Sequence, residues 1–580
     1  MESKRFLTLE QAVEYLNEIL DDDTQNIGDE IDICQLPPEE PADLTDEENI
    51  DDNILEEVTP SDVCGELVIT TNAEECTSEF PQPTTSRKGK RESNKHLGNP
   101  SWKKSTVIET DSLQDDDKFQ SLADKYPELL RLEPVELFHN ILPETYIDHL
   151  ASMSCLYAAQ KGKTVSYSKN DIAQFFGLLL LSGYHSVPRE DMYWSTAEDL
   201  TVSIVPSVMS RQKFRDIKKY FHVVDNTQLK QGDKLGKISP FYDELNKNLQ
   251  QYETFHKQLS IDESMVPYYG HHSCKMFIKG KPIRFGYKIW TLCSSDGYPY
   301  AMKIYQGKET EESNSPLGTR VVTALLNVVT NPLQVEIFFD NFFTSYALLR
   351  ELKIKGFKAI GTVREGRTGR CPLLPANEMK KKARGEFDFR CDGDIYMCRW
   401  HDNSVVTLAS NYQTHLPVGT TKRFSRQSKK RIEVLEPHIV RKYNKGMGGV
   451  DVFDRLLSSY RPQLRGKKWW WNLFSNGLNA AVVAAWRIHQ ELHGKNSKNH
   501  LDFRREVAIV LIRKNPRKTS RPGPRADIPE SLKKTDGHFL VQAEQGRCAF
   551  CKKNARLQCN ECARNMHIHC FPGFHGLSQV

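Results

Sequence analysis

The order of apolar segments in residues 258–365 constrains the fold more strongly than any other feature of the chain. Their residue types and spacing predict five strands, at 259–262, 283–293, 298–305, 335–339 and 357–363. Two predicted helices, 318–330 and 344–355, separate the last three strands. Asp262 and Asp340 end the first and the fourth strand, and ligand sites concentrate at such carboxyl ends. We therefore expect the two aspartates to meet at one edge of a mixed α/β sheet.

A third carboxylate follows this core. Asp451 opens an amphipathic segment after Met447-Gly448-Gly449-Val450, and Asp454 lies three residues later on the same helical face. Two strand-end carboxylates and one on a helix suit a pair of Mg²⁺ ions, the device that cuts and rejoins phosphodiesters. The β-β-β-α-β-α-β order is that of an RNase H-like fold, so all four aspartates are candidate catalytic metal ligands. For Asp454 alone, a charge in the first turn of a helix explains the residue equally well.

Charge is distributed unevenly along the chain. Residues 1–57 contain 20 Asp and Glu against 2 Lys and Arg, although the whole chain has a net charge of +3. An acidic tail on a basic body indicates an interaction segment joined to a protein that binds a polyanion. We expect residues 1–115 to form a disordered acidic tail, because they are poor in periodic apolar residues. The basic cluster Arg87–Arg91 in this tail is a candidate nuclear import signal.

Hydropathy and cysteine usage narrow the class of protein. The charged start of the chain does not resemble a signal peptide, and the most apolar run, 175–181, is too short to span a bilayer. Of the 14 cysteines, 5 lie between 548 and 570 and 9 are scattered. We therefore expect an intracellular protein without a membrane partner, which carries one metal-binding module and no disulfide framework.

Periodicity and composition divide the rest of the chain. A 3.6-residue repeat predicts helices in 116–257, ahead of the first part of the core at 258–365. Residues 366–436 interrupt the core as a β-rich insertion with basic stretches, and the core resumes at 437–463. A basic, proline-rich linker follows at 511–537.

Basic and aromatic residues interleave in two segments, as in a groove that binds nucleic acid. The first segment follows Asp262 and the second follows Asp451. The cations predicted to contact DNA are Lys275, Lys279, Lys281, Arg284, Lys288, Arg465, Lys467 and Lys468. The second segment also contains Trp469–Trp471, whose indoles either stack on a base or fill the core.

The C-terminus has the most specific spacing in the chain. Two Cys-x2-Cys pairs, a His-x2-Cys pair and a final histidine indicate structural Zn²⁺. The expected ligands are Cys548, Cys551, Cys559, Cys562, His567, Cys570 and His575. Seven ligands exceed one tetrahedral site and fall one short of two, so His538 or His569 is expected to supply the eighth.

These motifs carry a resemblance to a known family. The matching segments are Ile261–Met265, Lys279–Lys288, Phe339–Ser345, Gly361–Arg364, Met447–Asp451, Arg465–Trp469 and the terminal Cys/His finger. They are specific, and they occur in the order found in the family. From about residue 130 to its end, the chain resembles the piggyBac transposase family, and more closely the vertebrate-type piggyBac-derived proteins.

The resemblance implies cut-and-paste DNA transposition in the nucleus. Strand cleavage and transfer at TTAA sites then depend on Mg²⁺ held by an aspartate triad and a fourth aspartate. The partners are double-stranded transposon ends and target DNA, bound by a homodimer whose bipartite helical domain is 116–257 and 464–510. The family finger, here 538–580, is a cross-brace of two Zn²⁺ ions that recognises transposon ends. Family sequences have a Gly-x-His-Phe-like setting here, which favours His538 over His569 as the eighth ligand.

Two other functions are compatible with the sequence. A domesticated, transposon-derived protein would bind specific DNA and act on chromatin without cutting it. In a weaker alternative, the finger reads histone or other peptides, and either the finger or the acidic tail contacts chromatin proteins. The intact aspartates Asp262, Asp340 and Asp451 favour the transposase, because a protein that only binds DNA does not need unpaired carboxylates beside phosphates.

Overall fold

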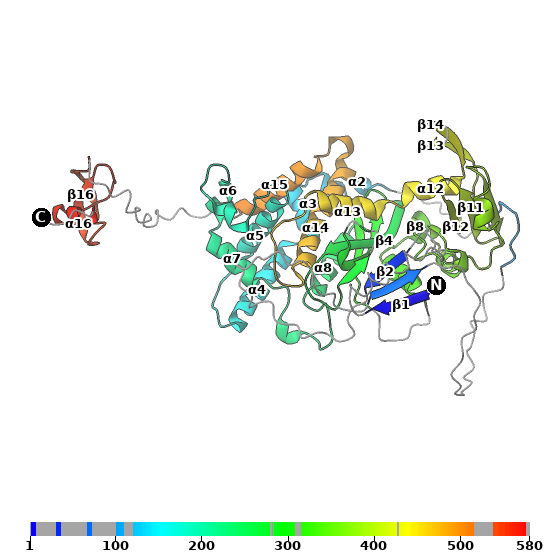
Figure 1. Cartoon of the computed structure of the whole chain (residues 1–580), viewed down its shortest axis with the longest axis horizontal. Helices are drawn as coiled ribbons and strands as arrows, with labels where there is room; N and C mark the ends of the chain where they lie inside the picture. Colours follow the sequence, from blue (N-terminus) through cyan, green and yellow to red (C-terminus); the bar gives the residue numbers. More distant parts are fainter. Residues whose placement is uncertain are drawn as a thin grey trace, which may run out of the picture. The chain divides into compact units, whose positions relative to one another are not determined.

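The computed structural model divides the chain into two units, residues 1–516 and 517–580, which are described in turn. The described residues are 2–6, 31–35, 67–71, 100–108, 120–278, 281, 283–307, 315–425, 429–514 and 537–575. Helices and strands both build the larger unit, so the predicted α/β class is confirmed (Figure 1). Among these residues, no helix combines the length and the apolar character needed to cross a membrane.

A mixed sheet forms the centre of the larger unit. Its central strands are, in spatial order, β7 (Pro299–Ile304), β6 (Phe285–Ser294), β4 (Gln258–Pro267), β8 (Glu336–Phe339) and β9 (Lys358–Thr362). β4 runs antiparallel to β6 and parallel to β8, and β8 runs parallel to β9. All five strands lie in the predicted segments, but β4 continues to Pro267, so Asp262 lies inside its strand and the prediction that it ends the strand is wrong. β6 and β8 are buried along almost their whole length, as expected for strands covered on both faces.

Helices of the core pack on this sheet. They are α9 (Leu317–Leu326), α10 (Tyr346–Ile354), α12 (His438–Gly446) and α13 (Gly449–Ser459). α12 and α13 contact β4, α9 contacts β6 and β7, and α10 contacts β9. The predicted helices 318–330 and 344–355 correspond to α9 and α10. Because α12 and α13 come after the insertion, the insertion separates two parts of one packed body.

Residues 366–436 extend the same sheet instead of forming a separate lobe. β12 (Val405–Ser410) pairs with β9, and β11 (Tyr396–His401) and β10 (Phe387–Cys391) follow outward. The hairpin β13 (Gly419–Ser425) and β14 (Lys430–Glu436) forms a two-stranded sheet of its own. The short helix α11 (Ala376–Met379) precedes these strands. The sequence predicts β structure here, but not that it joins the central sheet.

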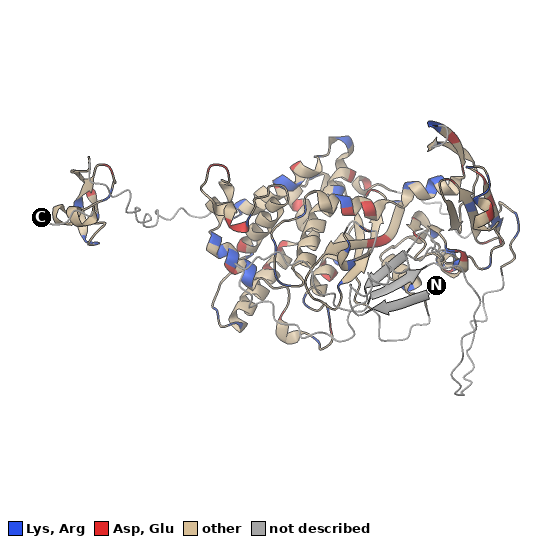
Figure 2. Ribbon diagram, viewed as in Figure 1, with Lys and Arg blue, Asp and Glu red and all other residues tan. Residues whose placement is uncertain are grey.

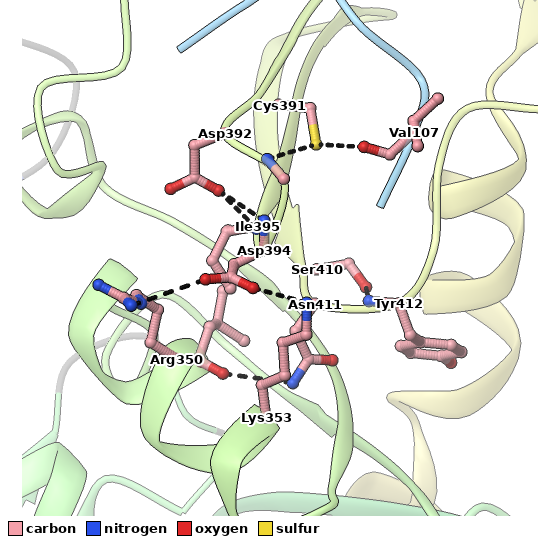
Figure 3. A network of polar contacts seen from close by, with 12 residues as sticks. Val107, Arg350, Lys353, Cys391, Asp392, Asp394, Ile395, Ser410, Asn411 and Tyr412 are labelled. Carbon is pink, nitrogen blue, oxygen red and sulfur yellow. Dashed lines mark hydrogen bonds and ion pairs between the residues drawn. The ribbon is translucent and has the colours of Figure 1, made fainter. Parts of the chain in front are cut away.

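A polar network fastens this extension to the core (Figure 3). Lys353 and Arg350 of α10 form ion pairs with Asp394 in the turn between β10 and β11, with N–O distances of 2.8 and 3.6 Å. Asn411 is fully buried after β12, and its amide group bonds to backbone groups of Leu349, Phe357 and Ala359. Buried polar groups need such partners, so these bonds fix how the extension meets α10 and β9.

The helical part combines two segments that are distant in the sequence. The helices before the sheet are α2 (Leu122–Lys125), α3 (Pro134–Ile141), α4 (Glu144–Gln160), α5 (Lys169–Ser182), α6 (Ile204–Val208), α7 (Arg211–Tyr220) and α8 (Ser239–Leu249). After the core, α14 (Trp471–His493) packs on α3 and α8, and α15 (His500–Arg513) packs on α5. Trp470 and Trp471 are buried in this body, so two of the three adjacent indoles fill the core.

The N-terminal segment differs from the expected disordered tail in two ways. Three strands are described there, β1 (Glu2–Phe6), β2 (Ile31–Gln35) and β3 (Leu67–Thr71). β1 and β2 pair with β3, and β2 also pairs with β5 (Met276–Ile278) beside β6. Residues 100–108 lie along the insertion, where Lys103 forms a β-bridge with Cys391. The Arg87–Arg91 cluster and most of the 511–537 linker lie outside the described residues.

The smaller unit has the cysteine-rich core of a small metal-binding module. It contains β15 (Leu540–Arg547) paired with β16 (Asn554–Cys559), followed by the helix α16 (Phe571–Phe574). Its buried cluster consists of Cys548, Ala555, Cys559, Met566 and Cys570. So small a buried cluster is not enough to hold a fold on its own, and such modules usually need a metal or disulfides. Three of these five buried residues are cysteines, which points to a metal.

Candidate active site

Two neighbouring strands place Asp262 and Asp340 side by side. In the parallel pair β4–β8, Ile261 lies opposite Phe339, so an aspartate comes next on both strands. Asp262 accepts a hydrogen bond from the following backbone N–H at 2.7 Å, and Asp340 accepts one from two residues further on at 2.9 Å. The two aspartates are therefore neighbours, as expected, although only Asp340 follows the end of its strand and Asp262 lies in the middle of β4.

Two glycines bring helices α12 and α13 against the sheet. A Cβ atom on Gly449 would lie 2.1 Å from the carbonyl oxygen of Ser294, and one on Gly446 would lie 2.3 Å from the ring of Phe338. A side chain at either position would push its helix away from the strands. Gly449 therefore sets how closely the first turn of α13, which carries Asp451, approaches the sheet.

The alternation of side chains along β4 indicates which residues face α13. Ser260 lies against Gly449 at the start of α13, and the Ser264 hydroxyl donates a hydrogen bond to the Asp454 carboxylate. Successive strand residues point to opposite faces, so Asp262, two residues from each serine, faces α13 as well. β4 and α13 therefore bring Asp262 towards the acidic face of the helix.

Burial raises the pKa values of these carboxyl groups. The pKa of Asp262 rises to about 7, mainly through burial and also through the charges of Glu263 and Asp340, although Lys281 opposes the shift. Burial and Glu263 also raise the pKa of Asp340. The pKa of Asp454 rises to about 6, because burial outweighs the hydrogen bond that it receives from β4. Crowded, desolvated carboxyl groups of this kind are stabilised in their ionised form by a nearby cation.

Lys281 lies among the acidic groups of the site. Burial lowers its pKa, but four nearby carboxylates outweigh burial and raise the pKa overall. These carboxylates belong to Asp262, Glu263, Asp451 and Asp454. The Lys281 amino group lies 3.7 Å from Glu263, which Lys288 approaches to 3.8 Å. Lys281 therefore lies among the aspartates and offsets part of their charge, whereas Lys288 pairs with Glu263.

The aspartates do not by themselves form a closed metal-binding group. In the described part of the chain, three groups of Cys, His or acidic ligand atoms lie within 4.8 Å of one another. Two of them lie in the smaller unit, and the third consists of His256, Asp296 and Glu491. The four aspartates therefore lie in one region of the structure, but no three of their carboxylates lie within 4.8 Å of one another.

Two of the predicted DNA-binding lysines bond to the protein backbone instead. Lys275 is buried, and its amino group donates to the Gly270 carbonyl at 3.2 Å. Lys468 donates to the carbonyls of Lys219 and Phe221, both at 2.8 Å, and so caps the C-terminal end of α7. Interleaved basic and aromatic residues therefore do not identify phosphate contacts on their own.

The remaining predicted cations differ in exposure. Arg284 and Arg465 are exposed, Lys467 is half-buried, and Lys279 lies outside the described residues. Figure 2 shows further Lys and Arg along α7, three of which form ion pairs with acidic residues of the helical part. Arg284 and Arg465 are therefore the predicted cations most accessible to a phosphate backbone.

The smaller unit gathers its Cys and His side chains into two sets of four. One set is His538, Cys559, Cys562 and His575, and the other is Cys548, Cys551, His567 and Cys570. The two sets interleave along the chain, which is the arrangement of a cross-brace. The Nδ1 atom of His538 lies 3.4 Å from the sulfur of Cys559 and 3.2 Å from that of Cys562. His569 belongs to neither set, in agreement with the preference for His538.

The donor atoms in these sets fit Zn²⁺. The Nδ1 atom of His567 lies 3.4 Å from the Cys551 sulfur, while its Nε2 atom lies 2.9 Å from the Asn554 carbonyl oxygen. A ring N–H bonded to a carbonyl leaves the other ring nitrogen free to bind a metal. Four thiolate and imidazole donors in a tetrahedral group are typical of structural Zn²⁺.

The sequence reasoning missed Glu263 and Ser264. Ser264 donates a hydrogen bond to Asp454, and Glu263 forms ion pairs with Lys281 and Lys288. The signal for Ser264 was available, because a residue two positions from Asp262 shares its face of the strand. No comparable signal identified Glu263, since its lysine partners also suited a DNA-binding groove.

Comparison with known proteins defines the class. A family model described as transposase IS4 matches residues 133–486, so this is a chain of the transposase class. Human piggyBac transposable element-derived protein 3 is 36% identical over 451 residues, which cover 76% of each chain. Human piggyBac transposable element-derived protein 2 is 35% identical over 453 residues, covering 77% of this chain and 76% of that protein. The chain belongs to the piggyBac transposase family.

A solved structure also has this fold. It is the cryo-EM structure of the piggyBac transposase synaptic complex with hairpin DNA. The likeness has a TM-score of 0.57 at 20% identity and covers 76% of this chain and 98% of that chain. At this identity, the match concerns the arrangement of helices and strands.

Proposed function

We propose that the chain is an Mg²⁺-dependent DNA transposase that cleaves and joins strands by cut-and-paste at TTAA sites. Membership of the piggyBac family supports this reaction class. The observation that carries the proposal is the in-register parallel pair β4–β8, which places Asp262 beside Asp340 on the region that α13 approaches. The strand order β7-β6-β4-β8-β9 further supports an RNase H-like core.

The chemistry of the donor set fits Mg²⁺. The ligands would be Asp262, Asp340, Asp451 and Asp454, whose carboxylate oxygens are the hard donors that this ion prefers. Raised pKa values at three of these groups reflect desolvated, crowded charge, which a divalent cation relieves. When bound, a pair of Mg²⁺ ions stabilises charge on the attacking and leaving oxygens of a phosphodiester.

The surrounding residues orient and neutralise the carboxylates. The Ser264 hydroxyl holds Asp454 in place, so the helix-borne carboxylate keeps its direction towards β4. Lys281 lowers the pKa of Asp262 and thereby favours the ionised form that binds metal. The exposed Arg284 and Arg465 are positioned to contact phosphates of the substrate.

We further propose that the substrate is double-stranded DNA at transposon ends and TTAA targets, bound by a homodimer in the nucleus. Two interleaved Cys/His sets support a cross-brace finger with two Zn²⁺ ions that contacts DNA. The related solved structure is by its title a synaptic complex with hairpin DNA. The Arg87–Arg91 cluster supports nuclear import, and the acidic tail and the finger are candidate contacts for chromatin proteins.

Excision in cells tests this function. The genomic flanks of the gene's own locus are placed around a split reporter, and wild type is compared with Asp340→Asn. Asp199→Asn is the control, because Asp199 is exposed in the helical part. We expect reporter repair with wild type and Asp199→Asn but not with Asp340→Asn. Repair by Asp340→Asn would refute the assigned metal ligand, and specific binding to the flanks without any repair would indicate a DNA-binding protein that does not cut.

A further inference from the structure

A second group of metal-ligating side chains lies outside the active site and the finger. His256 comes just before β4, Asp296 lies in the turn between β6 and β7, and Glu491 lies in the last turn of α14. One ligand atom from each residue lies within 4.8 Å of the other two. The group therefore bridges the helical part and the central sheet within the larger unit.

The distances in this group fit one small divalent ion. His256 Nε2 lies 3.4 Å from an Asp296 carboxylate oxygen and 3.9 Å from a Glu491 carboxylate oxygen. In a tetrahedral site with metal–ligand distances of about 2.1 Å, neighbouring ligand atoms are about 3.4 Å apart. The first distance matches that spacing, and the exposed Glu491 side chain can close the second by a small rotation.

The His256 ring is held in an orientation suited to a metal ligand. The Tyr300 hydroxyl lies 2.7 Å from Nδ1 and also accepts a hydrogen bond from the Phe255 N–H at 3.1 Å. The Nε2 atom is buried and has no hydrogen-bond partner within the described ranges. Nε2 therefore faces two carboxylates as the nitrogen available to a cation.

The neighbours of Asp296 fix its carboxylate and leave the group negatively charged. The guanidinium of Arg487 pairs with one carboxylate oxygen, and the Ser294 hydroxyl donates to the oxygen that faces His256. Two carboxylates against one guanidinium leave a net charge of −1 beside the imidazole. A divalent cation at this position therefore gains electrostatic energy and satisfies the buried ring nitrogen.

We propose that His256, Asp296 and Glu491 bind a divalent transition-metal ion, with Zn²⁺ as the ion to test. One imidazole and two carboxylates suit Zn²⁺, whereas Mg²⁺ prefers oxygen donors alone. The bound ion links α14 to the turn between β6 and β7. A Cβ on Gly297 in this turn would lie 3.0 Å from Val452, so the turn packs closely against α13. An ion bound here therefore also stabilises the surface that α13 contacts.

Zinc content of the purified full chain tests this site. The protein is stripped with a chelator, reloaded with Zn²⁺, and its zinc per chain is measured by mass spectrometry. We expect wild type to hold one more Zn²⁺ per chain than His256→Gln or Glu491→Gln. His493→Gln is the control on the same helix end and should retain the wild-type number. Because all four proteins share the finger, the difference isolates this site, and the experiment does not depend on transposition.

Thermal unfolding of the larger unit gives a second readout. Added Zn²⁺ should raise its Tm in wild type and in His493→Gln but not in Glu491→Gln. Glu491 is exposed, so its variant keeps the test decisive even where His256→Gln fails to fold. Equal zinc content and an equal Tm response in wild type and Glu491→Gln would overturn the proposal and leave an ion-pair network only.

Discussion

Replacing Gly449 with alanine should withdraw α13 from the sheet. The added Cβ would lie 2.1 Å from the carbonyl oxygen of Ser294 and 2.5 Å from the Ser260 hydroxyl, whereas Cβ contacts under 3.0 Å essentially never occur. Opening the first distance to that limit requires a displacement of about 0.9 Å. Because the closer atom belongs to the backbone of β6, a side-chain rotation cannot relieve the contact.

The displacement of α13 determines how much stability and how much strand cleavage we expect the variant to lose. Overpacking of this kind destabilises a protein by about 1–3 kcal/mol. The better helix propensity of alanine returns at most about 1 kcal/mol, and a full return would leave a net loss of about 0–2 kcal/mol. The same displacement moves Asp451 and Asp454 relative to Asp262 and Asp340. A misplacement near 1 Å predicts a loss of strand cleavage of about 100-fold.

Gly448→Ala is the matched control. A Cβ on Gly448 meets nothing within 4 Å, and its φ of −75° suits alanine. We expect its free energy of unfolding to stay within about 0.5 kcal/mol of wild type, with cleavage unchanged. Urea unfolding and Mg²⁺-dependent nicking of duplex DNA measure the two effects. Equal behaviour of Gly449→Ala and Gly448→Ala would refute the close helix–sheet contact, and lost stability with normal cleavage would refute the link from α13 to the chemistry.

Other parts of the structure give three further predictions. Folded Asp262 has a pKa of about 7 against about 3.9 unfolded, so in chelator Tm should fall as pH rises through this window. Asp262→Asn should flatten that dependence, and an unchanged slope would contradict the shift. Cys559→Ser should release Zn²⁺ and make 537–575 protease-sensitive; a lowered Tm of the larger unit would contradict two separate units. Asn411→Ala should cost roughly 3 kcal/mol in urea unfolding, because three buried backbone groups lose a partner, and a change below about 1 kcal/mol would contradict that network.

The strands of the core could be predicted because their signal is local. Leu259–Asp262 and Val335–Asp340 each combine an apolar run with an aspartate, and the parallel pairing of β4 with β8 places the two aspartates together. Seven of the eight finger ligands could be predicted from their spacing, whereas the preference for His538 over His569 came from the family resemblance. In both cases, most of the information lies in residues that are close together in the sequence.

The remainder depends on contacts that neighbouring residues do not encode. The sequence predicts that β12 is a strand but not which strand it pairs with. Its pairing with β9 joins residues more than 40 positions apart, such as Leu408 and Thr362. The basic segment around Lys468 predicts a phosphate contact. The amino group instead donates a hydrogen bond to a backbone carbonyl at the C-terminal end of α7. The sequence specifies a charge at such positions, and only tertiary packing decides which partner receives it.

The continuity of the central sheet determines how the insertion can move. β8, β9, β12, β11 and β10 form one hydrogen-bonded ladder, so residues 387–410 cannot swing about a hinge without breaking backbone bonds next to Asp340. A load applied at β10 is instead transmitted through the ladder to the strand that carries this aspartate. Hairpin β13–β14 lies outside this ladder, but the Trp400 indole N–H of β11 donates to the Leu435 carbonyl at 2.9 Å and Arg423 pairs with Asp402 at 3.0 Å, so a load on the hairpin also reaches the ladder through β11.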